Sequence, residues 1–185
     1  MHWLITLLLL AHTFNFMKVY FAADHAGFAL KEQLITFVRE LAVPGTDQGY
    51  NLEDFGAYEF DADDDYPDYV QLAAAAVARE SGARAIIFGA SGQGEAIVAN
   101  RVAGVRAVVY YGEPSVQQTD ADGEDLGMIA STRTHNDSNV LSLAARFLTL
   151  KEAQMAVQLW LETGFEGGER HVRRIAKIDL VKSGQ

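Results

Sequence analysis

The chain has 185 residues, of which 49% are hydrophobic and 22% are charged, so it is long enough for one domain with a substantial core and too short to suggest two. Its 15 Lys and Arg against 25 Asp and Glu give a formal net charge of −10, and a surface of that sign repels nucleic-acid phosphates and anionic lipid heads. The sequence contains no cysteine, which excludes disulfides, cysteine-ligated metals and thiolate nucleophiles. We therefore expect neither nucleic acid nor membrane among its partners.

Residues 1–16 form an apolar segment ahead of the first expected strand. The run from Trp3 to Ala11 is much shorter than the ~20 apolar residues of a membrane-spanning helix. No Lys or Arg precedes Lys18, although a secretory signal normally has one before its apolar stretch. We therefore interpret residues 1–16 as a mis-assigned or non-native extension, with a secretory signal or an anchor as alternatives, and residues 17–185 as a single domain.

The rest of the chain alternates short β-rich runs with longer segments of helical periodicity. We expect strands at 18–23, 51–55, 85–88, 106–110 and 140–143, and helices at 30–41, 65–80, 95–100 and 149–162. The last helix begins with a capping box, Thr149 to Glu152. Apolar strands separated by helices predict an α/β fold with a mostly parallel, doubly wound sheet, whose ligands bind outside the carboxyl ends of the strands.

Polar side chains follow the first and third expected strands. Asp24 and His25 come directly after the first strand, and a glycine-rich loop with Ser91 runs from Gly89 to Gly94 after the third. The backbone N–H groups of such a loop can surround an anion at the start of a helix. The order G-x-x-G-x-G, with no lysine after it, is neither a P-loop nor the dinucleotide fingerprint. A tight turn without a ligand is the alternative.

Glu95 stands on the first turn beyond this loop, where its carboxylate either reaches a bound ligand or only complements the helix dipole. Two acidic runs, at 61–65 and 120–125, read as solvated loops. The end of the chain is basic, because five basic residues from Arg170 onward face a single Asp179, a local charge of +4. These arginines are either ordinary surface charge or an anion-binding site.

Five segments between Met17 and about Leu180 together form a specific pattern. They are A-A-D-H-A-G-F-A-L-K (Ala22 to Lys31), D-Y-P-D (Asp65 to Asp68), G-A-S-G-Q-G-E-A-I-V-A-N (Gly89 to Asn100), H-N-D-S-N-V-L (His135 to Leu141) and F-E-G-G-E-R-H-V-R-R-I (Phe165 to Ile175). In this order they resemble the type B ribose-5-phosphate isomerases, a family that includes galactose- and allose-6-phosphate isomerases. The resemblance implies a Rossmann-like three-layer α/β/α domain with a five-stranded sheet, aldose–ketose isomerisation of a phosphorylated sugar, and no cofactor or metal. It also implies a cytoplasmic homodimer or dimer of dimers with its site at the subunit interface.

Many members of that family have a cysteine at the position of Gly89 and use it as the base, whereas this chain resembles the subgroup in which a glutamate takes that role. The resemblance therefore assigns proton transfer through an enediolate to Glu95. It places the developing oxyanion at Ser91, Gly92 and Gly94, and it assigns sugar-ring opening to His135 with Asp24 and His25. It assigns phosphate binding to Arg146, Arg170, His171 and Arg174, with help from Arg133 and Asn136.

Two departures leave the substrate open. The family's R-E-H-N-D reads Arg133-Thr134-His135-Asn136-Asp137 here, and the stretch 111–132 is longer than usual. Ribose 5-phosphate is the expected substrate, and a six-carbon sugar phosphate is the alternative within the same chemistry. A non-catalytic sugar-phosphate-binding module and a dinucleotide-dependent oxidoreductase are alternatives from other classes. Glu95 together with Ser91 argues against the former, and the glycine order argues against the latter.

Overall fold

The computed structural model describes residues 16–46, 49–116, 118–120, 123 and 125–180. The interpretation of residues 1–16 as an extension therefore falls outside the described residues, apart from Phe16, and so does Lys182 of the basic end. The described chain forms one five-stranded sheet in the order β2-β1-β3-β5-β4, with every pair of neighbours parallel. The strands are β1 (Lys18–Ala23), β2 (Asn51–Asp54), β3 (Arg84–Gly89), β4 (Ala107–Tyr110) and β5 (Val140–Ala144).

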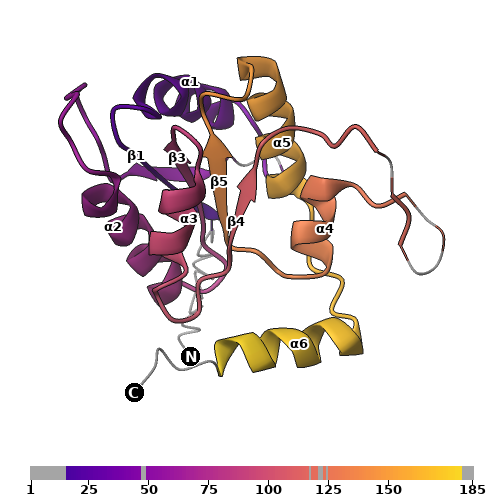
Figure 1. Cartoon of the computed structure of the whole chain (residues 1–185). Coiled ribbons are helices and arrows are strands. Elements are labelled where there is room, and N and C mark those ends of the chain that lie inside the picture. The colour runs from indigo at the N-terminus through magenta and orange to yellow at the C-terminus, as the bar shows by residue number, and fades with distance from the viewer. Residues whose placement is uncertain (1–15, 47–48, 117, 121–122, 124, 181–185) are drawn as a thin grey trace, which may run out of the picture.

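Helices cover both faces of this sheet, which confirms the predicted three-layer α/β/α fold (Figure 1). The helices are α1 (Phe28–Arg39), α2 (Tyr66–Arg79), α3 (Gln93–Ala99), α4 (Met128–Thr134), α5 (Leu150–Glu162) and α6 (Glu169–Asp179). The expected strands and the four expected helices all form, with ends that differ by only a few residues. The capping box that starts α5 is present, because Thr149 accepts from the Glu152 amide and Glu152 accepts from the Thr149 amide.

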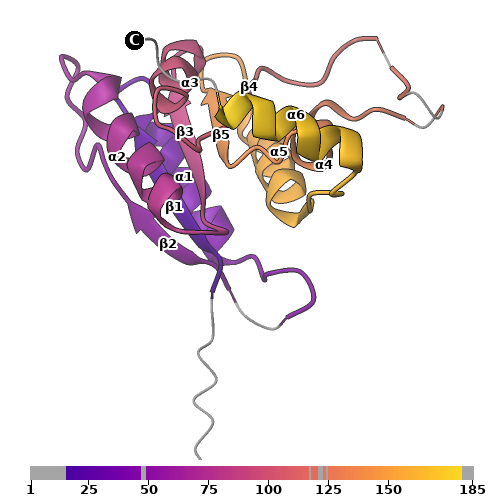
Figure 2. The same ribbon diagram turned by 90° about the horizontal axis from the view of Figure 1, so that it is seen from below.

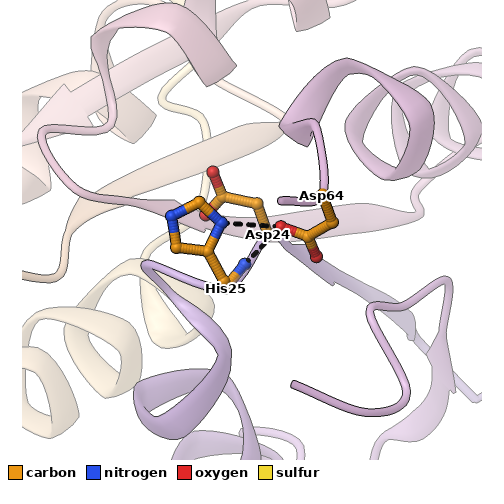
Figure 3. A group of neighbouring side chains, drawn as sticks. All are labelled: Asp24, His25 and Asp64. Atoms are coloured by element: carbon orange, nitrogen blue, oxygen red, sulfur yellow. Dashed lines mark hydrogen bonds and ion pairs between the residues drawn. The ribbon is translucent and has the colours of Figure 1, made fainter. Parts of the chain in front are cut away.

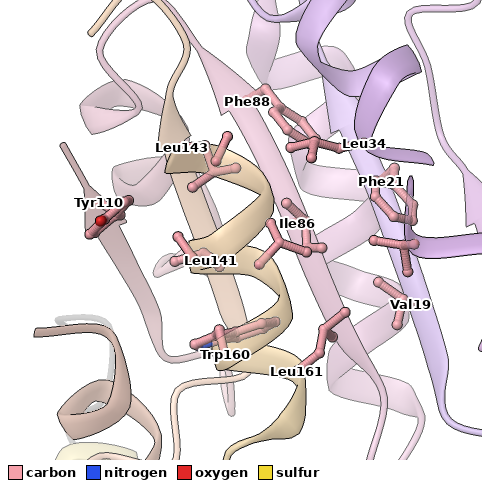
Figure 4. Packing of buried hydrophobic residues seen from close by; sticks show 14 of the residues in the cluster. Val19, Phe21, Leu34, Ile86, Phe88, Tyr110, Leu141, Leu143, Trp160 and Leu161 are labelled. Atoms are coloured by element: carbon pink, nitrogen blue, oxygen red, sulfur yellow. The ribbon is translucent and has the colours of Figure 1, made fainter. Parts of the chain in front are cut away.

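Two hydrophobic layers hold the helices to the sheet. Successive side chains of a strand point to opposite faces, so Phe21 and Ile86 pack against α1 and α5 (Figure 4), whereas Ala22 and Ile87 pack against α2 and α3. The first layer contains the large side chains, among them the fully buried Trp160. The second layer is rich in alanine, which lets α2 approach the sheet closely. Apolar residues on both strand faces therefore account for the doubly wound architecture.

Helices α4 and α6 lie in segments to which the sequence assigned no helix. Helix α4 ends the long stretch 111–132, after an arm that is tied by the isolated bridge between Thr119 and Asp125. Helix α6 carries the basic residues of the C-terminal end and runs along the outside of the molecule (Figures 1 and 2). Among the described residues, no helix is long and apolar enough to cross a membrane.

The parallel sheet gives the molecule two distinct edges. Its carboxyl edge carries the turns that follow β1, β3 and β5, and its amino edge carries the segments that enter β4 and β5. Helix α6 lies at the amino edge, where Asp179 comes within 3.6 Å of Arg106, the residue that precedes β4. Because β5 has five residues, about 16 Å of strand separates the two edges.

Candidate functional site

The carboxyl edge brings together the predicted residues that follow β1 and β3. Asp24 and Glu95 are both buried there, with 6% and 4% of their surface exposed. The Asp24 carboxylate accepts hydrogen bonds from the Ala26 and Gly27 amides and so closes the turn into α1. The charge of Asp24 contributes to the raised pKa of Glu95, which indicates that the two carboxyl groups lie near each other.

The glycine loop after β3 turns the chain sharply into α3. Gly92, the N-cap of α3, has φ = 71°, a left-handed conformation that glycine adopts without a steric penalty. The buried Ser142 hydroxyl of β5 donates a 2.6 Å hydrogen bond to the Gly92 carbonyl. Ser91 is half-buried in this loop, and its hydroxyl accepts from the Gln93 amide at 3.5 Å. The neighbouring strand therefore fixes the backbone on which Ser91 and Glu95 are placed.

The side chain of Glu95 folds back over the end of β3. A Cβ atom added to Gly89 would overlap the Glu95 carboxyl group, so the absence of a side chain at position 89 makes room for the carboxylate. Burial raises the pKa of Glu95, and the nearby charge of Asp24 raises it further, against the opposing effect of a hydrogen bond from its own amide. A buried carboxylate with a raised pKa is suited to take a proton from carbon and return it.

His25 is held by Asp64, which lies between β2 and α2. The Asp64 Oδ1 atom accepts from the His25 backbone amide at 2.9 Å and lies 2.7 Å from His25 Nδ1 (Figure 3). The prediction that the whole acidic run 61–65 is solvated is wrong for Asp64, whose side chain is only 5% exposed. The two hydrogen bonds to Oδ1 offset part of the cost of burying this carboxylate, whose Oδ2 is buried without a hydrogen-bond partner among the described residues. Asp61, Asp63 and Asp65 remain exposed.

Asp24, His25 and Asp64 each offer a ligand atom within 4.8 Å of the others, a spacing that prompts the question of a metal ion. These ligand atoms already have hydrogen-bond partners within the chain. Asp64 Oδ1 and His25 Nδ1 are at hydrogen-bond distance from each other, and Asp24 Oδ1 accepts from two amides. The geometry of these three residues is that of a hydrogen-bonded group rather than a ligand set, and we assign no metal to it.

Arg146 follows β5 and joins the same edge. Its backbone amide donates to the Ala90 carbonyl of the glycine loop at 3.2 Å, and its side chain is exposed. A guanidinium group at this place can bind an anion that enters beside the loop. The carboxyl-edge group therefore consists of Asp24, His25, Ser91, Gly92, Gly94, Glu95 and Arg146.

The remaining predicted residues gather at the amino edge. The His135 ring, at the end of α4, stacks on the His171 ring of α6 with a centroid distance of 4.4 Å and an interplanar angle of 4°. Arg170 Nε donates to His171 Nε2 at 3.1 Å. Burial lowers the pKa of His171, and His135, Arg170 and Arg174 lower it further. The structure therefore forms a second group, which consists of His135, Asn136, Arg170, His171 and Arg174.

Arg133 serves the fold at this edge. It is 5% exposed, and its guanidinium donates to the Asp137 carboxylate and to the Ser138 and Thr163 carbonyls. Because these bonds lie within the chain, we leave Arg133 out of the phosphate-binding residues proposed below. Asn136 is exposed and stays a candidate.

Three residues of the carboxyl edge were absent from the sequence-based site. Asp64 is one of four aspartates in the same run, and Ser142 lies in an otherwise apolar strand, so neither stands out in the sequence. Gly89 shares its loop with two other glycines, so the sequence does not show that its missing side chain makes room for Glu95. A polar residue within a strand that is otherwise apolar, such as Ser142, is a sequence signal for a buried hydrogen bond.

A parallel doubly wound sheet, with a glycine loop and a buried carboxylate at its carboxyl edge, defines a Rossmann-like α/β protein, a class that binds ligands outside the carboxyl ends of its strands. The chain belongs to the Ribose/Galactose Isomerase family, whose model matches residues 19–178. Ribose-5-phosphate isomerase B of Mycobacterium tuberculosis is 35% identical over 159 residues, or 86% of each chain.

Solved structures agree with this assignment. Ribose-5-phosphate isomerase B of Clostridium thermocellum has a TM-score of 0.71 at 34% identity, covering 88% of this chain and 95% of that one. The enzyme of Mycoplasma genitalium, solved with bound ribulose 5-phosphate, has a TM-score of 0.69 at 33% identity, with coverages of 88% and 94%.

Proposed function

We propose that this protein interconverts ribose 5-phosphate and ribulose 5-phosphate, with Glu95 as the base. The observation that carries the proposal is the buried Glu95 carboxylate, which fills the space beside Gly89 and has a raised pKa. The names of the relatives and the ribulose 5-phosphate bound to the Mycoplasma genitalium enzyme support the choice of sugar. A cytoplasmic location belongs to the same proposal, since a sugar phosphate carries charges that do not cross a membrane unaided.

In this mechanism His135 assists opening of the furanose ring, which exposes the C1 aldehyde. Glu95 then takes the proton from C2, and the electron pair moves toward the C1 oxygen to give an enediolate. The O2 proton passes to O1, and Glu95 returns its proton to C1, which leaves the ketone at C2. Ser91 and the amides of Gly92 and Gly94 stabilise the oxyanion, a role worth about 3–4 kcal/mol for one well-placed donor.

One chain alone does not assemble this site. Glu95 lies at the carboxyl edge, and His135 lies at the amino edge with Arg170, His171 and Arg174. We therefore infer a composite site, in which one protomer supplies Glu95 and its partner supplies His135 and the phosphate-binding residues of α6. The exposed apolar side chains of α6, Val172 and Ile178, are 49% and 51% exposed, and a partner chain would cover them.

Mixing two damaged chains tests the composite site. One chain carries Glu95→Gln, and the other carries His135→Asn together with Arg174→Ala. In a random mixture half of the dimers are mixed, and each of these has one intact site, so the mixture should recover about a quarter of wild-type activity. No recovery in a mixture that forms mixed dimers would show that each chain carries a complete site.

The substrate is tested with a coupled assay on a panel of five- and six-carbon aldose phosphates. We expect the highest kcat/KM with ribose 5-phosphate. A higher value with allose or galactose 6-phosphate would replace the substrate but keep the chemistry. Binding without turnover of any sugar phosphate would instead identify a binding module.

A further inference from the structure

Asp64 makes two hydrogen bonds to a single residue of the carboxyl edge. Its Oδ1 atom faces both the backbone amide and the ring Nδ1 of His25, at 2.9 and 2.7 Å. The His25 amide begins the turn after β1, so these bonds tie the turn to the segment that enters α2 (Figure 3). A carboxylate that holds both the main chain and the ring of one histidine restricts where that ring can point.

The bond to Asp64 also sets the state of the imidazole. An ionised carboxylate only accepts hydrogen bonds, so Nδ1 carries the proton that it receives. The second ring nitrogen, Nε2, is not needed for this bond. The Phe60 ring packs edge-on against the imidazole with a centroid distance of 6.3 Å, which limits its rotation. His25 is therefore held in one orientation, with Nε2 on the side of the ring away from Asp64 (Figure 3).

The charges around the dyad of His25 and Asp64 favour the imidazolium form. The hydrogen bond that His25 donates to Asp64 raises the pKa of His25, desolvation opposes this effect, and the charge of Asp24 raises the pKa as well. Burial raises the pKa of Tyr69 on α2, and the nearby charge of Asp64 raises it further. Asp24 acts on Glu95 too, which places the His25 ring and the proposed base around the same carboxylate.

We propose that Asp64 is a positioning residue of the isomerase, which holds His25 so that its Nε2–H donates to an oxygen of the sugar beside Glu95. The proposal rests on the isomerase function given above. Asp64 itself does not contact the substrate in this arrangement. It acts by fixing the ring and by favouring its protonated form, as a buried carboxylate does for a histidine in other enzymes.

Substitutions of Asp64 separate the two effects. Asp64→Asn keeps an oxygen that can accept from the His25 amide but removes the charge, and Asp64→Ala removes both. Asp63→Asn, in the same loop with an exposed side chain, is the matched control. We expect kcat/KM for ribose 5-phosphate to fall about tenfold in Asp64→Asn and further in Asp64→Ala, with no change in Asp63→Asn. The alkaline limb of the pH profile should move to lower pH in Asp64→Asn, because its imidazole loses the proton earlier.

Nitrogen NMR of the His25 imidazole measures the protonation of both ring nitrogens without any need for turnover. In the wild type we expect Nδ1 to stay protonated and His25 to titrate at higher pH than in Asp64→Asn. Identical titration in the two proteins would overturn the proposal. In a His25→Ala background, Asp64→Ala should cost no further activity, and an additional loss there would show that Asp64 acts by another route.

Failure of the isomerase function gives a different result. A wild type that turns over no sugar phosphate but shows the expected imidazole titration would refute the function and keep the dyad. In that case the affinity for ribose 5-phosphate decides whether His25 faces a ligand. Equal affinities of the wild type and Asp64→Ala would then refute the positioning role.

Discussion

The two edges of the sheet carry functional groups of opposite character. At the carboxyl edge Glu95 and Asp24 are buried, and a loop, a glycine and a neighbouring strand fix their places. At the amino edge Arg170 and Arg174 are exposed on an outer helix, and only His171 is buried among them. Proton transfer needs a carboxylate whose pKa is raised by removal from water, whereas a phosphate dianion is bound by charged donors that can reach it. The carboxyl edge is therefore suited to the proposed proton transfer, and the exposed arginines of the amino edge are suited to the proposed phosphate binding.

Among substitutions that test the different roles of the two edges, we expect the largest effect from Glu95→Gln. The amide keeps the shape of the side chain but has no basic oxygen, so kcat should fall by about 10³-fold. Binding of ribose 5-phosphate, measured by calorimetry, should stay unchanged because Glu95 is not among the proposed phosphate-binding residues. Full activity in this variant would show that Glu95 is not the base. It would also contradict the proposed difference in role between the two edges.

Gly89→Ala should produce the next largest effect. The added methyl group would overlap the Glu95 carboxyl group, so the base must move, and a displacement of about 1 Å can reduce the rate by about 100-fold. The loss should appear in kcat, measured in the coupled assay. Gly164→Ala is the control, because a Cβ at Gly164 meets nothing within 4 Å. Equal activities of the two variants would show that the space at Gly89 has no role.

The sequence predicted the carboxyl edge more completely than the amino edge for a physical reason. Strand periodicity locates the strand ends, and residues just after parallel strands, such as Asp24 and Ser91, must lie at one edge. This rule does not apply to His135, because His135 precedes its strand, β5, whereas the rule concerns residues that follow a strand. The resemblance grouped His135 with Asp24 and His25 for ring opening, but within one chain His135 lies at the amino edge and the other two residues lie at the carboxyl edge.

The sequence also did not identify which charged residues are buried. Lys31 is fully buried on α1, where its amine bonds to Asp54 and to the Ala57 carbonyl. Asp64 differs from its exposed neighbours only through His25. Burial of a charge depends on a partner that is distant in the sequence, so neither local composition nor periodicity identifies it.

At the amino edge a smaller effect is expected from Arg174→Ala. Loss of one charged donor to phosphate should raise KM for ribose 5-phosphate about tenfold, with little change in kcat. Arg173→Ala removes the same charge from the same helix at a position that we do not assign to the site. Steady-state kinetics of both variants decide the case. Equal KM values would mean that the net charge of α6, and not a specific arginine, attracts the substrate.

The smallest effect concerns stability at the carboxyl edge. Burial raises the pKa of Glu95 in the folded protein, so the folded state disfavours the ionised form and the wild type loses stability as pH rises through that pKa. Glu95→Gln has no charge to bury, and its melting temperature should exceed that of the wild type at about pH 8. The difference should vanish below the ordinary pKa of a glutamate, where the wild-type side chain is neutral in both states. Glu59→Gln, at an exposed position, should melt like the wild type throughout. If Glu95→Gln were instead less stable than the wild type at high pH, the ionised carboxylate would stabilise the fold. Burial of Glu95 would then not be a case in which a catalytic role reduces stability.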